Sequence, residues 1–281
     1  MLQKILIPLS FHESYEQIEK MCALFKNFGT EEAVLLHVGS KRGGSGRRSR
    51  EKLESYAEKI RQVGIDTKST IYPGSVQVEI VRAAGDWEAG YIGFPFKRKN
   101  WLKRTILGSV VKDVIRQSEI PVFVFKEKSS RGKEEDEPFR IMYPSSLHWE
   151  EDIILSYIEN DFFMADEVEF LYVGKRAPDP VVEQKRLDWV EDKLNKMRER
   201  VGLSEEKSKS INLLGSPRRV IVKTARRRSV DLILLGKADS VSGVGPVLGS
   251  TAEEVSYNAS CSVLIIPRDL VPPAARKEGE Q

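Results

Sequence analysis

The chain has 281 residues, of which 45 are Lys or Arg and 42 are Asp or Glu, so its formal net charge is only +3. A chain of this length forms one large or two ordinary domains, and 40% apolar residues can fill real cores, which excludes a disordered chain. So small a net charge points to no particular partner, and any electrostatic signal must lie in how the charges are distributed.

Short aliphatic and β-branched runs alternate with longer segments of helical spacing along the chain. In chain order, strands are predicted at 4–9, 33–38, 70–72, 121–125 and 231–236. A helix is predicted near 180–202, with one apolar face formed by Leu187, Val190, Leu194, Met197 and Val201. Strands that alternate with helices indicate βαβ units and a parallel sheet, so ligands are expected beyond the carboxyl ends of the strands.

Five short segments of the first half recur in the second half, in the same order. The offset is 136 residues for the first pair and 141 for the last three. The pairs are Ile5–Ser10 with Ile141–Ser146, Leu35–Gly39 with Phe170–Gly174, Gly74–Ser75 with Gly215–Ser216, Leu107–Ser109 with Leu248–Ser250, and Ile120–Phe125 with Cys261–Ile266. An ordered repeat of this kind predicts two copies of one α/β domain.

The domain boundaries follow from the composition between and after the copies. We predict a first domain at 1–126, a charged linker at 127–138, a second domain at 139–267 and a flexible tail at 268–281. No apolar run approaches the roughly 20 residues of a membrane span. The two cysteines, Cys22 and Cys261, fit buried thiols in a reducing compartment, so a cytoplasmic protein without a membrane partner is expected.

A glycine-rich loop precedes the last predicted helix of the second copy. It runs from Gly236 to Gly249, and Ser250 and Thr251 follow it. Free N–H groups at a helix start favour an anion such as a phosphate. The alternative is that Ser250 only caps the helix. Neither a Walker P-loop nor a dinucleotide fingerprint is present.

These motifs together resemble the universal stress protein family, and the resemblance covers both copies. It rests on the Ile-Pro of the first strand, the Leu-Leu-His-Val of the second, the Gly-Ser before the third helix, and the Gly-Ser that precedes a short helix and a final Pro-Val-Phe-Val strand. The resemblance implies two tandem Rossmann-like domains of the adenine nucleotide alpha hydrolase-like type, each a five-stranded parallel sheet flanked by helices. It also implies pairing between the two domains and leaves a homodimer open.

Some members of this family bind ATP through a Gly-x-x-Gly-x9-Gly-Ser/Thr motif and through an Asp two residues after the first-strand Pro. In the second copy, Asp239 replaces the middle Gly and Ser146 replaces the Asp. ATP or AMP, with or without Mg²⁺, is the expected ligand. The nucleotide-binding residues that the resemblance implies in this copy are Pro144, Ser146, Val173, Gly236, Gly249, Ser250 and Thr251.

The first copy departs further from the motif, because Phe96 replaces the second Gly and Ser10 stands at the Asp position. A serine cannot accept two strong hydrogen bonds as a carboxylate does. The residues of this second, degenerate site are Pro8, Ser10, Val38, Gly93, Gly108 and Ser109.

The first copy also carries a basic patch in the loop after its fourth strand. The patch consists of Lys97, Arg98, Lys99, Lys103 and Arg104. Such a cluster attracts anions, although a solvated basic loop explains it equally well.

Signals for catalysis are weak. The three histidines are His12, His37 and His148; His12 and His148 are expected in the first helical turn of each copy, and His37 packed at the end of a strand. No catalytic residue or resident metal site is predicted, so we do not expect an enzyme beyond weak or absent ATP hydrolysis.

We therefore predict a ligand-responsive regulatory module that binds an adenine nucleotide, chiefly in the second domain. The alternative is a nucleotide-free scaffold that recognises an unknown protein or a polyanion through the basic patch of the first domain. Nucleic acid is not the expected partner of either form, and the sequence does not identify the stress or the pathway.

Overall fold

The structure is a computed structural model, and it describes residues 2–39, 46–96, 108–127, 137–147, 151–160, 162–237, 249–267 and 270. Its contacts group the described residues into two compact units. The first unit holds the residues up to Glu127, and the second holds the described residues from 137 onward. Each unit is one layered α/β domain, and the two are described separately below as domain 1 and domain 2.

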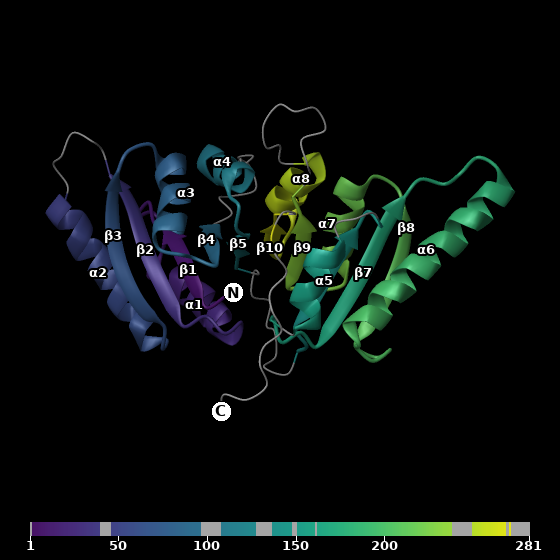
Figure 1. Cartoon of the computed structure of the whole chain (residues 1–281), viewed down its shortest axis with the longest axis horizontal. Coiled ribbons are helices and arrows are strands. Elements are labelled where there is room, and N and C mark those ends of the chain that lie inside the picture. The colour runs from purple at the N-terminus through teal and green to yellow at the C-terminus, as the bar shows by residue number, and fades with distance from the viewer. Residues whose placement is uncertain are drawn as a thin grey trace. The chain divides into compact units, whose positions relative to one another are not determined.

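Domain 1 is a parallel sheet with strand order β3-β2-β1-β4-β5 (Figure 1). Helices α1 and α2 contact each other, and so do α3 and α4. The elements are β1 (Lys4–Pro8), α1 (Tyr15–Asn27), β2 (Glu32–Gly39), α2 (Gly46–Gln62), β3 (Asp66–Pro73), α3 (Val76–Asp86), β4 (Tyr91–Phe96), α4 (Ser109–Gln117) and β5 (Val122–Lys126).

Domain 2 repeats this plan with strand order β8-β7-β6-β9-β10, again parallel throughout (Figure 1). Its elements are β6 (Arg140–Ser145), α5 (Glu151–Glu159), β7 (Glu167–Gly174), α6 (Pro180–Val201), β8 (Ser208–Leu214), α7 (Pro217–Arg227), β9 (Leu232–Gly236), α8 (Ser250–Asn258) and β10 (Ser262–Ile266). The predicted α/β fold, with two tandem five-stranded parallel sheets, is therefore confirmed.

The direction of winding reverses between the first and fourth strand of each domain. In domain 2, β6 pairs with β7 over six residues, from Arg140 to Ser145, but with β9 only at Ile141 and Met142. In domain 1, β1 likewise pairs with β4 only at Ile5 and Leu6. Because the two strands separate beyond these pairs, a crevice opens at their carboxyl ends, where open α/β sheets bind ligands.

The cores lie between the sheets and the helices. In domain 1, the Phe25 ring meets the Tyr91 and Phe123 rings edge to face, at centroid distances of 5.2 Å and 4.9 Å. Both cysteines are buried and neither forms a disulfide, as predicted, and burial raises the pKa of the Cys22 thiol to about 12. No helix within the described residues is long and apolar enough to cross a membrane.

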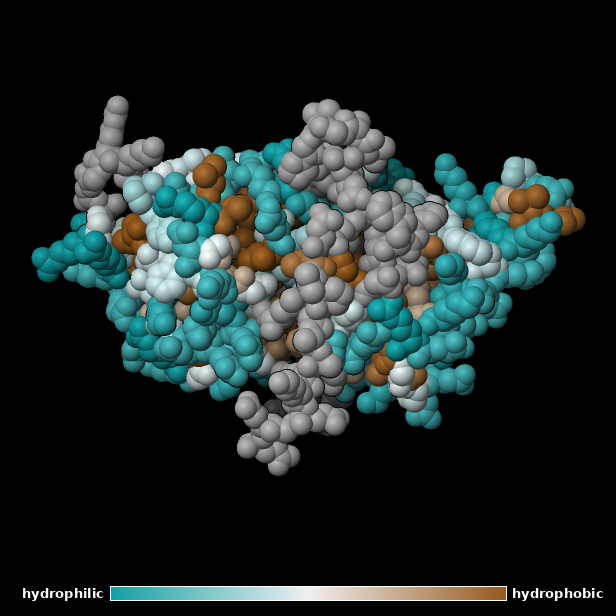
Figure 2. Space-filling view, viewed as in Figure 1, coloured by the Kyte–Doolittle hydropathy of each residue, from teal (hydrophilic) through white to brown (hydrophobic). Residues whose placement is uncertain are grey.

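Helix α6 confirms the predicted helix and most of its apolar face. Its N-cap Asp179 accepts hydrogen bonds from two backbone N–H groups, and Gly202 ends it in the left-handed conformation. Four of the five predicted face residues are buried, but Leu187 is 37% exposed. Figure 2 shows hydrophobic surface where α6 begins, and Val181 and Val182 are exposed there.

A buried carboxylate that pairs with a partly exposed arginine distinguishes domain 2 from domain 1. Glu169 in β7 is 1% exposed, and its Oε1 accepts a hydrogen bond of 2.5 Å from Arg228 Nε at the end of α7. The strand register places Val34 at the equivalent position of domain 1, since Val34 pairs with Leu6 as Glu169 pairs with Met142. The fold therefore accepts an apolar residue at this position.

The ion pair yields a prediction about stability. Arg228→Ala leaves a buried carboxylate without its cation, so the free energy of unfolding should fall by about 2–3 kcal/mol. The double variant Glu169→Val, Arg228→Ala should recover most of this loss, because it restores the residue that domain 1 uses. Urea denaturation of the three proteins measures both effects, and equal losses in the single and double variants would contradict the account.

Candidate functional site

Domain 2 contains a cavity of about 460 Å³ at the carboxyl ends of its strands, within the usual size range of small-ligand sites. It opens where β6 and β9 separate, so the cavity lies in the crevice that the strand order predicts. Its lining combines apolar side chains with serine, threonine and tyrosine hydroxyls. The lining residues are Pro144, Ser145, Ser146, Leu171, Tyr172, Val173, Pro217, Ile221, Leu235, Gly236, Gly249, Ser250, Thr251 and Ala252.

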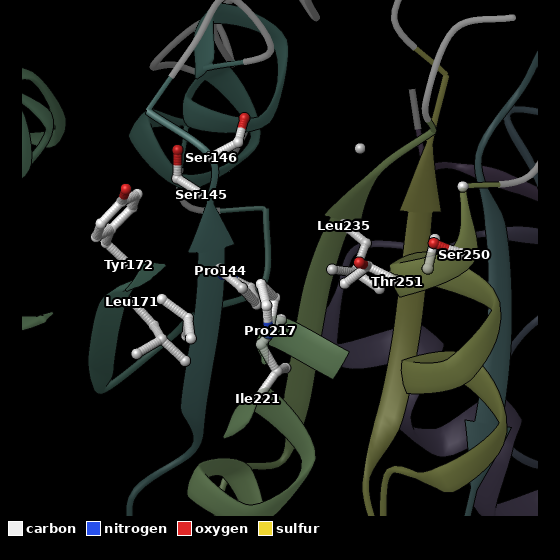
Figure 3. A pocket seen from close by; sticks show the side chains of 14 residues that line it. Pro144, Ser145, Ser146, Leu171, Tyr172, Pro217, Ile221, Leu235, Ser250 and Thr251 are labelled. Carbon is white, nitrogen blue, oxygen red and sulfur yellow. The ribbon is translucent and has the colours of Figure 1, made fainter. Parts of the chain in front are cut away.

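All seven residues predicted for the second copy line this one cavity. They come from four separate places: the end of β6, the end of β7, the end of β9 and the start of α8. Figure 3 shows Ser145 and Ser146 on one side of the hollow and Ser250 and Thr251 on the other, with Pro144, Pro217 and Ile221 between them. The cavity thus has two polar rims and an apolar floor.

The rim at α8 is a helix start with free backbone donors. The N-cap residue is Gly249, with φ −57° and ψ 138°, and no side chain caps the helix. The alternative that Ser250 is the cap is therefore wrong, because Ser250 is the first helical residue. The first N–H groups of α8 have no partner within the helix, and together with the Ser250 and Thr251 side chains they can bind an anion.

The rim at β6 is set by a sharp turn after the strand. Leu147 has a positive φ of 60°, and the buried Ser145 accepts a hydrogen bond of 2.8 Å from its N–H. Ser146 is exposed, lines the cavity and makes no side-chain hydrogen bond within the described residues. Its hydroxyl can therefore donate to or accept from a ligand.

Tyr172 lies across the last residue of β7. A Cβ atom on Gly174 would lie 2.7 Å from Tyr172 Cε1, so a side chain there would push the ring from this position. The ring also meets Trp189 of α6 edge to face, at a centroid distance of 6.3 Å. Glycine at 174 thereby lets an aromatic wall line the cavity.

Domain 1 differs at the end of its first strand. Ser10 is equivalent to Ser146, but its hydroxyl donates to Glu13 Oε1 at 2.6 Å, and its oxygen lies 3.3 Å from His12 Nδ1. His12 lies before the N-cap Ser14 of α1, so the expectation that it occupies the first helical turn is wrong. The side chain that would meet a ligand here is bonded within the chain.

The neighbouring side chains of domain 1 also contact one another. Phe11, with φ 67°, stacks on His37 at a centroid distance of 4.1 Å. His37 Nδ1 donates to the Leu9 carbonyl at 2.9 Å, so this histidine is packed at the end of its strand, as predicted. His37 stands where domain 2 has Tyr172. The Phe11–His37 stack therefore lies where domain 2 keeps its cavity wall.

Gly93 does not belong to the degenerate site. It lies in the middle of β4, paired with Phe123, whereas Gly236 ends β9. The registers make Pro95 the equivalent of Gly236, because Ile92 pairs with Val122 as Ile233 pairs with Val263. A Cβ atom on Gly93 would lie 2.6 Å from Ile5 Cδ1, so this glycine makes room for the core.

The other predicted residues of the degenerate site lie at the crevice of domain 1. Pro8 ends β1, Val38 lies near the end of β2, and Gly108 caps α4 with φ −51° and ψ 142°, which closely match the angles of Gly249. Ser109 begins α4 as Ser250 begins α8. The backbone of the site is thus repeated in domain 1, while the side chains at its first strand differ.

Several predictions fall outside the described residues. They are the whole basic patch (Lys97, Arg98, Lys99, Lys103 and Arg104), His148, Asp239 and most of the linker and the tail. Within the described residues, no three His, Cys, Asp or Glu side chains come together as metal ligands.

Arg218 contacts the cavity lining, although it is not itself a lining residue, and the sequence did not reveal this contact. It lies in the first turn of α7, and its Nη2 donates to Ser250 Oγ at 2.6 Å. The two residues are 32 positions apart, so only the packing of α7 against α8 brings them together. Comparison of the repeats could have marked the position, because Gln77 stands there in domain 1.

Comparison with known proteins agrees with this architecture. The model of the universal stress protein family matches residues 1–126 and 163–267. A universal stress protein of Methanocaldococcus jannaschii is 31% identical over 159 residues, an alignment that covers 46% of this chain and 98% of the relative. The chain belongs to the universal stress protein family, and the match to two segments makes it a tandem member.

Two solved structures share the fold over nearly the whole chain. A universal stress protein from Archaeoglobus fulgidus gives a TM-score of 0.71 at 22% identity and covers 95% of this chain and 97% of its own. A functionally unknown protein from Pseudomonas aeruginosa gives a TM-score of 0.72 at 17% identity, with coverages of 95% and 93%. At these identities the likeness shows the fold.

The packing around Gly93 gives a second prediction. Gly93→Ala should lower the free energy of unfolding by about 1–3 kcal/mol, because the added methyl group overlaps Ile5 and Phe25. Gly85→Ala is the matched control: its Cβ meets nothing within 4 Å in α3, so it should be neutral or stabilising by about 0.5–1 kcal/mol. Thermal unfolding compares the two, and a tolerated Gly93→Ala would contradict the core assignment.

Proposed function

We propose that this universal stress protein binds an adenine nucleotide, ATP or AMP, in the cavity of domain 2 and acts as a ligand-responsive regulatory module. The observation that carries the proposal is the convergence of all seven predicted binding residues on one cavity at the crevice of a parallel sheet. Neither the volume nor the polarity of the cavity would follow from the capping alternative.

The chemistry of the lining supports a nucleotide with its phosphates at α8. The N–H groups of that helix start, with the hydroxyls of Ser250 and Thr251, are donors suited to phosphate oxygens. At the other rim, Ser146 offers a free hydroxyl to a ribose or a base. Leu171, Val173 and Ile221 add an apolar surface for the adenosine end.

The lining supports binding more than catalysis. Among the described lining residues there is no histidine, cysteine or carboxylate, and the Tyr172 phenol is the one side chain of a type that can serve as a general acid or base. The proposed role is therefore that of a nucleotide-responsive module without appreciable turnover. Steady production of ADP by the pure protein would contradict this part of the proposal.

We propose that domain 1 binds a nucleotide more weakly than domain 2 does. Its helix start at Gly108 and Ser109 repeats that of domain 2, but Ser10 is bonded to Glu13, and Phe11 stacks on His37. A ligand would have to break these contacts before it could bind there. One nucleotide per chain is therefore the expected stoichiometry.

Isothermal titration of the full chain with ATP and AMP, with and without Mg²⁺, tests the proposal. Gly249→Asp should raise the Kd of ATP by at least about tenfold, because its carboxylate occupies the N–H groups of α8 and repels phosphate. The variant should stay folded, since φ at this position is −57° and Asp is a favourable N-cap residue.

The equivalent change in domain 1 is the control. Gly108→Asp places the same carboxylate at the start of α4, where the Cβ meets nothing within 4 Å, and it should leave ATP binding unchanged. No heat at millimolar nucleotide in the unmodified chain would contradict the proposal and favour a nucleotide-free scaffold. If Gly108→Asp weakened ATP binding more than Gly249→Asp did, the ligand would lie in domain 1, contrary to the proposal.

A further inference from the structure

Helix α7 places the exposed Arg218 against Ser250 of the cavity lining, and within the described residues the chain gives this arginine little else to bind. Within the described residues, the hydrogen bond to Ser250 Oγ at 2.6 Å is the one interaction of the Arg218 side chain, and no carboxylate pairs with it. A guanidinium has five N–H donors. Arg218 therefore keeps both its charge and most of its donors for a group outside the described chain.

The position of Arg218 is unfavourable for the helix to which it belongs. The first turn of α7 contains no acidic residue, and Arg218 and Arg219 both lie at the positive end of the helix dipole. No side chain caps α7 either; Pro217 has no N–H group and the Arg219 N–H donates to the Ser216 carbonyl at 3.1 Å, so within the described residues the Arg218 N–H is the donor of this first turn that lacks a partner. An anion in front of this helix start would compensate the charge of the arginine and the dipole of the helix together.

The bond to Ser250 also fixes the role of that serine. Because the arginine can only donate, Ser250 Oγ is the acceptor, and the hydroxyl hydrogen remains available to a second acceptor. Ser250 lines the cavity at the start of α8. The start of α8 and the Ser250 hydroxyl thus lie at one rim of the cavity, and the Arg218 guanidinium, which pairs with no carboxylate within the described residues, lies against that hydroxyl.

We propose that Arg218 is a specificity-determining residue that makes the cavity of domain 2 select phosphorylated nucleosides over the free nucleoside. This inference rests on the proposed nucleotide site and assigns to it a residue from α7. The guanidinium would contact the phosphate group bound at Ser250, where its planar donors can hold two phosphate oxygens at once.

The internal repeat supplies the natural substitution for a test. Domain 1 has Gln77 at the position of Arg218, in a helix with the same place in the fold. Arg218→Gln therefore removes the charge with a residue that this fold already accepts. Arg219→Gln is the matched control, because Arg219 is an exposed arginine of the same helical turn that makes no bond to α8 within the described residues.

The experiment is isothermal titration of the full chain with ATP, ADP, AMP and adenosine. Arg218→Gln should weaken ATP binding about tenfold or more and leave adenosine binding unchanged, because a charge-assisted bond to phosphate is lost. Arg219→Gln should change every Kd by less than about twofold. Arg218→Lys, which keeps the charge without the planar fork, should fall between the unmodified chain and Arg218→Gln.

The possible outcomes test the role of Arg218 separately from the proposed nucleotide site of domain 2. Normal ATP binding by Arg218→Gln, or an equal loss for ATP and adenosine, would overturn the role of Arg218 and leave the nucleotide site standing. An equally large effect of Arg219→Gln would reduce that role to general surface charge and so overturn it. Absence of binding of all four ligands to the unmodified chain would overturn the site and the role together.

Discussion

The candidate site depends on parallel strand pairing inside domain 2. Because β6, β7 and β9 all run in the same direction, their carboxyl ends meet at one edge of the sheet. Pairing between β6 and β9 stops after Met142 and Ile233, so the edge splits there, and the start of α8 closes the far side. Segments from 144 to 252 become neighbours through this constraint, and the cavity, its free helix start and its open serine all follow from it.

The two domains show what one backbone can do with different side chains. Both turn with a positive φ after the first strand, at Phe11 and Leu147, and both begin the last helix with Gly-Ser at nearly the same angles. Domain 1 bonds its first-strand serine to Glu13, whereas domain 2 leaves Ser146 open. The two domains thus share one backbone plan, and within the described residues domain 2 leaves the serine after its first strand open to a ligand.

The fold was largely predictable because buried parallel strands are continuous apolar runs. The internal repeat also allowed a strand to be recognised in either copy of the domain. Edge strands were harder: β3 and β8 each contain one buried residue and are otherwise exposed or half-buried, and only 70–72 of Asp66–Pro73 was predicted. The seven cavity residues followed from the family resemblance. Gly93 was misassigned because it is the glycine nearest the expected position, whereas the 13-residue step from Gly236 to Gly249 leads back from Gly108 to Pro95, in agreement with the register. Arg218 was missed because its contact with Ser250 arises only when α7 packs against α8.

The central claim is that the crevice between β6 and β9 holds an adenine nucleotide with its phosphates at the start of α8. A crystal structure of the full chain grown with saturating ATP tests it most directly. The account predicts density for one nucleotide per chain in this cavity, with a phosphate within hydrogen-bond distance of Ser250. An empty cavity at saturating ATP, or a nucleotide bound only in domain 1, would contradict it.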